Sequence, residues 1–305
     1  MRPSCITFQL AVLFVSALTI AAQEVPPRLT IEPEQVSPPC RSNVIPEGEH
    51  LKGIVASVFD KSSGRRVTGL KATDFLLTNG TNEIDTIASE VSGGPLSVAL
   101  LFDTSPSTAG QLGEMGRAAT RFMSVLNPKD KLAIYTFDGV VSEVVPFSEV
   151  EKLSNRTFRV EGVGWGTRLY DGIVKALSSE GFKGPGQKIL VIFTDGEDTR
   201  SSSANLKESL RLAFESDTFI YTFHHPKAST GWPQPNKYLQ ELAEMSGGRV
   251  VPVMSSSDAA KGLLAVPGEV RGKYILCYLT SDKNSEPKLK LRTADRDRTL
   301  RYKIY

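Results

Sequence analysis

The most constraining feature of this chain is an alternation of fully apolar runs with segments of helical periodicity over residues 94–270. Val98–Phe102 is apolar at every position, and the next segment carries Met115, Ala119 and Phe122 at spacings of four and three. Runs that are apolar at consecutive positions must be covered on both faces, as in a parallel sheet between two layers of helices. The pattern therefore predicts an α/β fold, an open, doubly wound and mostly parallel sheet.

Patterns typical of β structure flank this region on both sides. Residues 51–92 hold short apolar runs separated by turns, and residues 271–305 return to strands. Neither segment has enough strands to bury a face alone, so we expect the two to pack together as a small β layer or sandwich. Residues 23–50 are rich in proline and polar residues and are predicted to form a linker or an extended arm.

Residues 1–22 have the pattern of a secretory signal peptide. Arg2 supplies a positive charge, Ile6–Ile20 is apolar and uncharged, and Ala21 and Ala22 offer a cleavage site. The alternative is an uncleaved membrane anchor, but the apolar run is shorter than the roughly 20 residues that span a bilayer. We therefore expect an exported protein, periplasmic, extracellular or associated with the cell envelope, without a membrane span after leader removal.

The charge balance gives no indication of a polyanionic partner. Lys and Arg together number 36 and Asp and Glu number 34, giving a net charge of +2. This surplus is too small to indicate binding to nucleic acid or to an anionic membrane.

The cysteines do not form a disulfide framework. Cys5 would leave with the leader, and Cys40 and Cys277 are far apart in the sequence. One bridge between them is allowed. Cys277 lies in an apolar run, however, where a free cysteine most often behaves as a small buried hydrophobe, and we expect it to be unpaired.

Two of the apolar runs end in an acid, Asp103 and Asp195, at the carboxyl edge of the predicted sheet. Doubly wound folds bind their ligands at this edge. Ser105 and Ser107 follow in the string DTSPS, and a glycine-rich loop brings in Thr167. Carboxylate and hydroxyl oxygens are hard ligands, which select Mg²⁺, Ca²⁺ or Mn²⁺ over zinc or copper.

The strings DTSPS, GTRLYDGI and FTDGEDT, in this order, resemble the metal-ion-dependent adhesion site (MIDAS) of von Willebrand factor type A domains. The similarity covers about residues 96–264, and the phrases VTGLKATDF and YILCYLT also resemble secreted bacterial proteins that carry this domain. The resemblance implies that Ser105 and Ser107 contact the metal directly and that Thr167 does so directly or through water. It implies that Asp103 and Asp195 act largely through water.

The motif departs from the family pattern at two positions. Pro106 stands where the family usually has glycine, and Thr108 where it often has methionine. Proline fixes its own φ near −65° and pushes the preceding residue toward extended geometry. A turn that requires positive φ here would be spoiled, and the alternative to an intact site is a relic loop on a retained fold.

Other polar and aromatic residues near the motif allow two interpretations. Trp165 is a candidate partner contact or a residue that fills a gap under its loop, and Glu197 and Asp198 either tune the charge of the site or are solvated. His224 and His225 are neighbours in a strand and face opposite sides, so both cannot easily bind one metal, and we expect a structural or solvent-facing role. Asp138 has the form of a hairpin-turn residue.

The resemblance implies a binding module, not an enzyme. Its cofactor is a divalent cation, Mg²⁺ being expected first, and its partner an unknown protein or surface ligand that presents a carboxylate. A Mg²⁺-dependent phosphohydrolase is a weaker reading, because the sequence has neither a G-x-x-x-x-G-K nor a G-x-S-x-G motif. The third reading is a structural or assembly scaffold of the cell envelope with a non-functional metal site.

Overall fold

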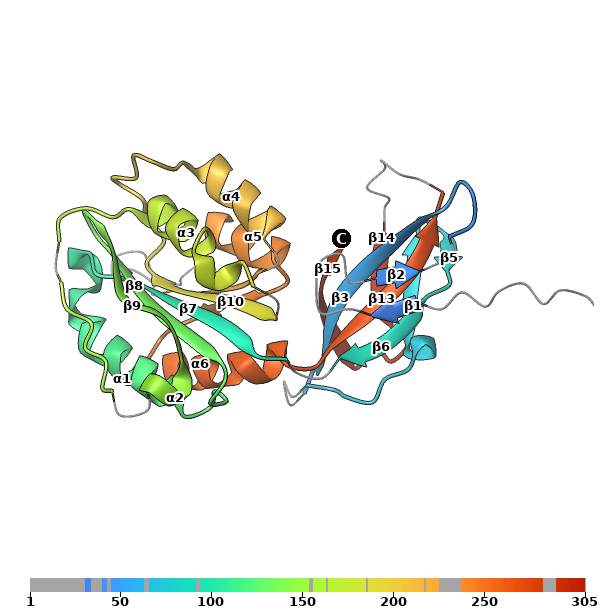
Figure 1. Cartoon of the computed structure of the whole chain (residues 1–305), viewed down its shortest axis with the longest axis horizontal. Helices are drawn as coiled ribbons and strands as arrows, with labels where there is room; N and C mark the ends of the chain where they lie inside the picture. Colours follow the sequence, from blue (N-terminus) through green and yellow to red (C-terminus); the bar gives the residue numbers. More distant parts are fainter. Residues whose placement is uncertain are drawn as a thin grey trace, which may run out of the picture.

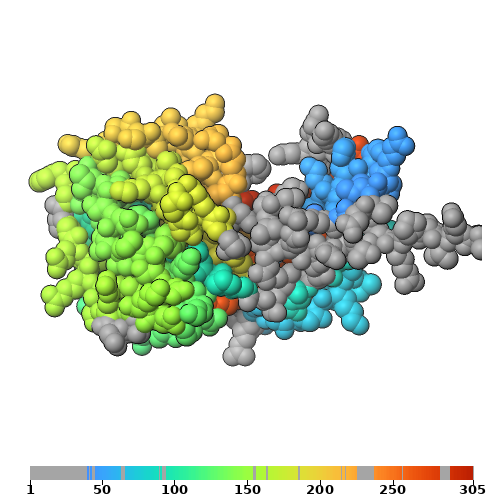
Figure 2. Space-filling view, viewed as in Figure 1, coloured from blue at the N-terminus to red at the C-terminus, as the bar shows by residue number. Residues whose placement is uncertain are grey.

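The computed structural model describes residues 31–33, 40–42, 45–62, 66–91, 94–153, 156–162, 164–184, 186–216, 218–224, 237–281 and 289–304. The proposed signal peptide and His225 lie outside these ranges. The chain forms two lobes, an α/β lobe and a β lobe (Figure 1). In the space-filling view the α/β lobe occupies one side of the molecule, and the blue and cyan surface of the β lobe lies on the other (Figure 2).

The α/β lobe is built on a six-stranded sheet with the order β12-β11-β10-β7-β8-β9. All neighbouring pairs are parallel except β8 and β9. The strands are β7 (Leu96–Asp103), β8 (Lys131–Phe137), β9 (Val141–Glu149), β10 (Gln187–Thr194), β11 (Thr218–His224) and β12 (Arg249–Pro252). The predicted doubly wound, mostly parallel sheet is confirmed.

Helices cover both faces of this sheet (Figure 1). Along β7, Val98 and Leu100 pack with side chains of α1 and α6, whereas Ala99 and Leu101 pack with those of α3, α4 and α5. Because successive side chains of a strand point to opposite faces, an uninterrupted apolar run buries both. The helices are α1 (Leu112–Met123), α2 (Val150–Leu153), α3 (Leu169–Leu177), α4 (Leu206–Glu215), α5 (Lys237–Met245) and α6 (Ser256–Val270). Short 3₁₀ turns are η1 (Ala72–Asp74), η2 (Pro106–Gln111) and η3 (Glu180–Phe182).

The β lobe is a sandwich of two antiparallel sheets with the orders β15-β3-β13-β6 and β14-β4-β5. Its core contains Ile54 and Tyr274 from the first sheet and Phe75 and Leu291 from the second. The strands are β3 (His50–Asp60), β4 (Phe75–Asn79), β5 (Asn82–Ile84), β6 (Ile87–Val91), β13 (Lys273–Thr280), β14 (Leu289–Thr293) and β15 (Arg298–Ile304). Strands from before and after the α/β lobe therefore pair, which confirms that the flanking β segments form one sandwich.

The expectation that Cys277 is unpaired is wrong. Cys40 and Cys277 form a disulfide across 237 positions of sequence. Cys40 lies in β2 (Cys40–Ser42), which pairs with β1 (Ile31–Pro33), so part of the segment expected to be a linker or extended arm is a small two-stranded sheet. The disulfide ties this strand pair to a central strand of the sandwich.

The two lobes meet through charged side chains that the sequence patterns did not single out. Glu269 of α6 is buried and accepts hydrogen bonds from Arg249 of β12 and from Arg301 of β15. Arg271, which follows α6, pairs with the fully buried Asp130, whose carboxylate also accepts the backbone N–H of Leu96 at the start of β7. Buried charges of this kind require a partner. Through Glu269 these contacts join the end of α6 to β12 of the α/β lobe and to β15 of the β lobe.

Candidate metal centre

The adjacency of β7 and β10 brings Asp103 and Asp195 to the same edge of the sheet. The two strands pair in parallel, with Phe102 opposite Phe193, so each acid follows its strand at the carboxyl end. Thr194 Oγ1 donates a hydrogen bond of 2.8 Å to Asp103 Oδ2. Asp103 is completely buried beneath the edge.

The DTSPS turn folds around the Asp103 carboxylate. The backbone N–H of Ser105 donates to Asp103 Oδ1 at 2.9 Å, and the hydroxyl oxygens of Ser105 and Ser107 lie 3.1 Å apart. Thr108 Oγ1 donates to the carbonyl oxygens of Asp103 and Ser105 at 2.7 and 3.0 Å. The turn therefore places two hydroxyl groups side by side next to a buried carboxylate, and the Thr108 hydroxyl ties the turn to the backbone of Asp103 and Ser105.

Pro106 fits this turn. Ser105 is extended, with φ −66° and ψ 163°, and Pro106 is the first residue of η2. Among the residues that the structure describes, only glycines have positive φ, so the turn does not need the geometry that proline forbids. Proline at the first position of a helical turn lacks only a donor that would be unsatisfied anyway. The departure from the family pattern thus leaves the turn unstrained.

We expect the Pro106→Gly variant to be less stable by about 0.4–1 kcal/mol, because glycine gives the unfolded chain more conformations to lose. Its Mg²⁺ affinity should fall rather than rise, since the two serine hydroxyls are held less firmly. Thermal unfolding and isothermal titration calorimetry measure the two effects. Pro128→Gly, at an exposed loop on the opposite edge of the sheet, is the control and should leave Mg²⁺ affinity unchanged. Tighter Mg²⁺ binding by Pro106→Gly would show that proline distorts the site.

The Thr167 loop is tied to the loop that carries Asp195. Thr167 is buried, its N–H donates to Thr199 Oγ1 at 2.9 Å, and its carbonyl accepts the N–H groups of Thr199 and Arg200 at 2.9 and 3.0 Å. These bonds hold the third hydroxyl residue of the motif against the FTDGEDT loop. Asp103, Ser105 and Ser107 are thus linked by hydrogen bonds, and the pairing of β7 with β10 brings Asp195 to the same edge. Thr167, the fifth predicted residue, is held there by its hydrogen bonds to the loop after β10.

Asp138 has a role that sequence reasoning missed. It does occupy the turn between β8 and β9, but its carboxylate also accepts hydrogen bonds from Thr104 Oγ1 and from the N–H of Gly164, each at 3.0 Å. A Cβ at Gly164 would lie 2.3–2.5 Å from the Asp138 carboxyl atoms, closer than atoms can approach. The glycine is therefore needed so that the carboxylate can bind the backbone, and Asp138 holds the glycine-rich loop beside the DTSPS turn.

The site carries concentrated negative charge in a buried setting. Burial raises the pKa of the Asp103 carboxyl, and the nearby Asp195 carboxylate raises it further, against hydrogen bonds from Ser105 and Thr194 that lower it. His224, at the end of β11 opposite Thr194, is a second buried neighbour. Burial lowers the pKa of this imidazole despite the opposing effects of Asp195 and the Thr194 backbone, so His224 is neutral and adds no positive charge.

The three candidate partner contacts differ in their surroundings. Trp165 is 81% exposed, so it does not fill a gap under its loop. Asp198 accepts hydrogen bonds from the N–H groups of Tyr170 and Ser201 and from the Ser201 hydroxyl, which orients it toward the start of α3. Glu197 is exposed beside the site. The aromatic ring therefore offers a large exposed contact surface beside the site.

The donor set fits a hard divalent cation. Among the described residues no group of three or more His, Cys, Asp and Glu side chains is placed to hold a metal, so a site built on carboxylates or imidazoles alone is not present there. The motif instead combines two carboxylates with serine and threonine hydroxyls. All are oxygen ligands, which suit Mg²⁺, Ca²⁺ or Mn²⁺.

A family model identifies the domain in the α/β lobe, and several solved structures resemble it more distantly. The family model of the von Willebrand factor type A domain matches residues 97–265. A solved von Willebrand factor type A structure from Catenulispora acidiphila is 10% identical, with a TM-score of 0.49 over 78% of this chain and 75% of that chain. BatB from Bacteroides thetaiotaomicron is 19% identical, with a TM-score of 0.44 over 57% of this chain and 98% of that chain.

A third solved structure is proximal thread matrix protein 1 from the mussel byssus, described with a zinc-occupied MIDAS motif. It is 15% identical, with a TM-score of 0.46 over 67% of this chain and 50% of that chain. A search of curated proteins finds no match.

The chain belongs to the von Willebrand factor type A domain family, because the family model covers more than half of it. No helix in the described part of the chain is long and apolar enough to cross a membrane.

Proposed function

We propose that the protein is an exported, non-enzymatic binding module that engages an acidic group of a partner through a divalent cation held by Asp103, Ser105, Ser107, Thr167 and Asp195. Mg²⁺ is the cation expected first. The partner is a protein or surface ligand that presents a carboxylate. Export is proposed from the leader-like pattern of residues 1–22, and the proposed location is periplasmic, extracellular or in the cell envelope.

The observation that carries the proposal is the arrangement around Asp103. Both carboxylate oxygens of Asp103 accept hydrogen bonds, one from the Ser105 N–H and one from Thr194 Oγ1. The buried acid therefore orients Ser105 and Thr194 at the carboxyl edge of the sheet. The hydroxyl oxygens of the buried Ser105 and the exposed Ser107 then lie 3.1 Å apart. Neutral hydroxyls leave most of a cation's charge uncompensated, and a bound Mg²⁺ would supply an open position for an external carboxylate oxygen.

A neighbouring cation favours the same kind of partner. Arg200 passes across Gly166, next to Thr167, because a Cβ at Gly166 would lie 2.4 Å from Arg200 Cδ and 2.7 Å from Arg200 Cγ. A guanidinium group forms strong, charge-assisted hydrogen bonds with carboxylates. Trp165 lies one residue before Gly166 and is exposed. An acidic residue flanked by an apolar one would complement this combination of charge and aromatic surface.

The test compares partner capture in Mg²⁺ and in EDTA. The mature chain is immobilised and exposed to an extract of the native source, and captured proteins are identified and measured individually. We expect at least one partner that binds in Mg²⁺ and is released by EDTA. Capture that is equal in both buffers would contradict the metal mechanism and favour the scaffold reading. Turnover of a general phosphatase substrate in Mg²⁺ would contradict the non-enzymatic assignment.

For such a partner, the Trp165→Ala variant should bind more weakly by about 2 kcal/mol, which is the loss typical of an exposed aromatic hot spot. Its Mg²⁺ affinity should stay unchanged, because the indole is a contact surface and not a ligand. Surface plasmon resonance and calorimetry measure the two quantities. Val125→Ala, another exposed apolar residue that follows α1 at the opposite edge, is the control. Equal losses in both variants would remove Trp165 from the proposed contact surface.

A further inference from the structure

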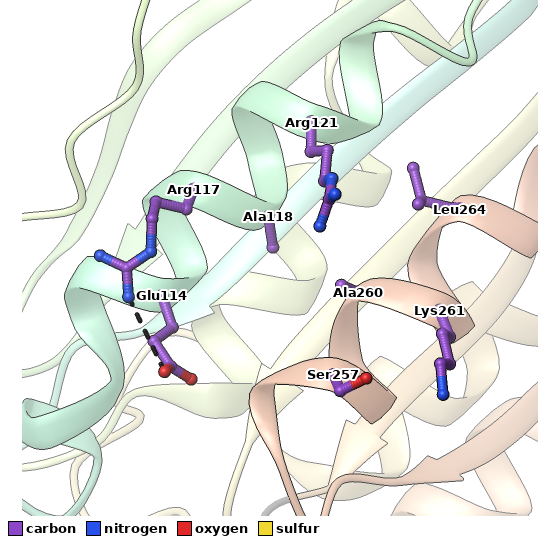
Figure 3. Close-up of a pocket in the computed structure, with 8 residues that line it drawn as sticks. All are labelled: Glu114, Arg117, Ala118, Arg121, Ser257, Ala260, Lys261 and Leu264. Atoms are coloured by element: carbon purple, nitrogen blue, oxygen red, sulfur yellow. Dashed lines mark ion pairs between the residues drawn. The ribbon is translucent and has the colours of Figure 1, made fainter.

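A groove of about 520 Å³ runs between α1 and α6, and none of its lining residues belongs to the candidate metal centre. Figure 3 shows side chains from both helices along it. Arg121 points from α1 toward α6, and Lys261 extends from α6. Both side chains are exposed. The groove is therefore open to solvent and bordered by cations from two helices.

The charges of the groove are unbalanced. Among the residues that the structure describes, neither Arg121 nor Lys261 forms an ion pair with an acid. Arg117 is paired only with Glu114, at 3.7 Å on an exposed surface. Arg117 and Arg121 are four residues apart on α1, where like charges repel and destabilise a helix. An excess of two positive charges in one groove stands out because the chain as a whole is nearly neutral.

The floor of the groove is apolar. Ala118 of α1 is buried, and Ala260 and Leu264 of α6 are partly buried. The small side chains of the two alanines allow the helices to pack closely while leaving room above them. A ligand that enters the groove therefore meets an apolar surface below and positive charge at the rim.

From this combination we infer that the groove binds an acidic peptide segment of a partner protein, with its carboxylates at Arg121 and Lys261 and an apolar side chain on the floor. A phosphate-rich polymer would complement the cations, but it would gain nothing from the apolar floor. A peptide that alternates acidic and apolar residues matches both features. This site is separate from the metal centre, so binding to it does not require a divalent cation.

The test uses a fluorescein-labelled synthetic peptide made of Glu-Glu-Leu repeats, titrated with the mature chain in EDTA and followed by fluorescence polarisation. The chain should bind this peptide saturably and bind the matched Glu-Glu-Ser peptide more weakly. The double variant Arg121→Glu, Lys261→Glu should bind at least about tenfold more weakly, because two attractions become repulsions. Lys207→Glu, an exposed charge reversal on α4, is the matched control and should bind as the native chain does.

The outcomes separate the alternatives. Unchanged binding by the double variant, or no saturable binding by the native chain, would overturn the site. Inorganic polyphosphate that binds tighter than the peptide and depends on the same two residues would overturn the peptide assignment in favour of a phosphate-bearing ligand. Circular dichroism of the variants checks that the fold is retained. EDTA is present throughout, so a failure here is independent of whether the proposed metal mechanism holds.

Discussion

The Asp103→Asn variant is expected to lose Mg²⁺ affinity by about 10–100-fold, the range found when a residue that orients metal ligands is replaced. Asp103 is fully buried and positions Ser105 through its N–H and Thr194 through its hydroxyl. Asparagine keeps the shape of the side chain but removes the negative charge and one acceptor. Isothermal titration calorimetry with Mg²⁺, Ca²⁺ and Mn²⁺ measures the loss, and capture of the Mg²⁺-dependent partner should fall with it.

The same variant should stay folded. Burial raises the pKa of the Asp103 carboxyl, because the fold disfavours the charged form of this group. The contribution of Asp103 to the stability of the fold therefore decreases as the pH rises through the raised pKa. A neutral asparagine removes that cost and offsets part of the lost hydrogen bonding. Asp85→Asn, at an exposed position of the β lobe, is the matched control. Unchanged Mg²⁺ affinity in a folded Asp103→Asn variant would contradict the assigned role.

Reduction of the Cys40–Cys277 disulfide is expected to lower the free energy of unfolding by about 2–5 kcal/mol. The bridge joins positions 237 residues apart, so it removes many conformations from the unfolded chain. It also fastens β2 to β13 in the sandwich. Guanidinium unfolding with and without dithiothreitol measures the difference, and the transition of the β lobe should move more than that of the α/β lobe. Hydrogen exchange in β1 and β2 should accelerate on reduction.

The Cys40→Ala variant is the control for this result. It should match the reduced native chain and show no further change with dithiothreitol, because Cys277 then remains as a small buried side chain. A thiol titration of the mature chain after unfolding without reductant should find no free cysteine. Two free thiols in that experiment, or an unfolding midpoint that reductant does not move, would contradict a stabilising bridge.

The local sequence pattern was sufficient to predict the α/β lobe and to bring Asp103 and Asp195 to one edge of its sheet. The run Val98–Phe102 is apolar at every position, and only a strand covered on both faces satisfies such a run. Asp103 and Asp195 each follow such a strand, and parallel strands end at the same edge, so their proximity followed from order alone. The flanking β segments were predicted to pair because neither had enough strands to bury a face by itself.

Contacts between distant segments required the tertiary structure. The disulfide of Cys40 and Cys277 depends on which strands meet across the sandwich, and the composition around Cys277 is equally suited to a free buried thiol. The sequence around Asp138 predicts only a turn residue, and the hydrogen bond from the Gly164 N–H to its carboxylate is visible only in the structure. Glu269 becomes a junction residue only where α6, β12 and β15 meet. The spacing of apolar residues along the sequence indicates which face of a helix or strand is buried. The identity of the groups across that face is set by three-dimensional packing, and the tertiary structure alone decides it.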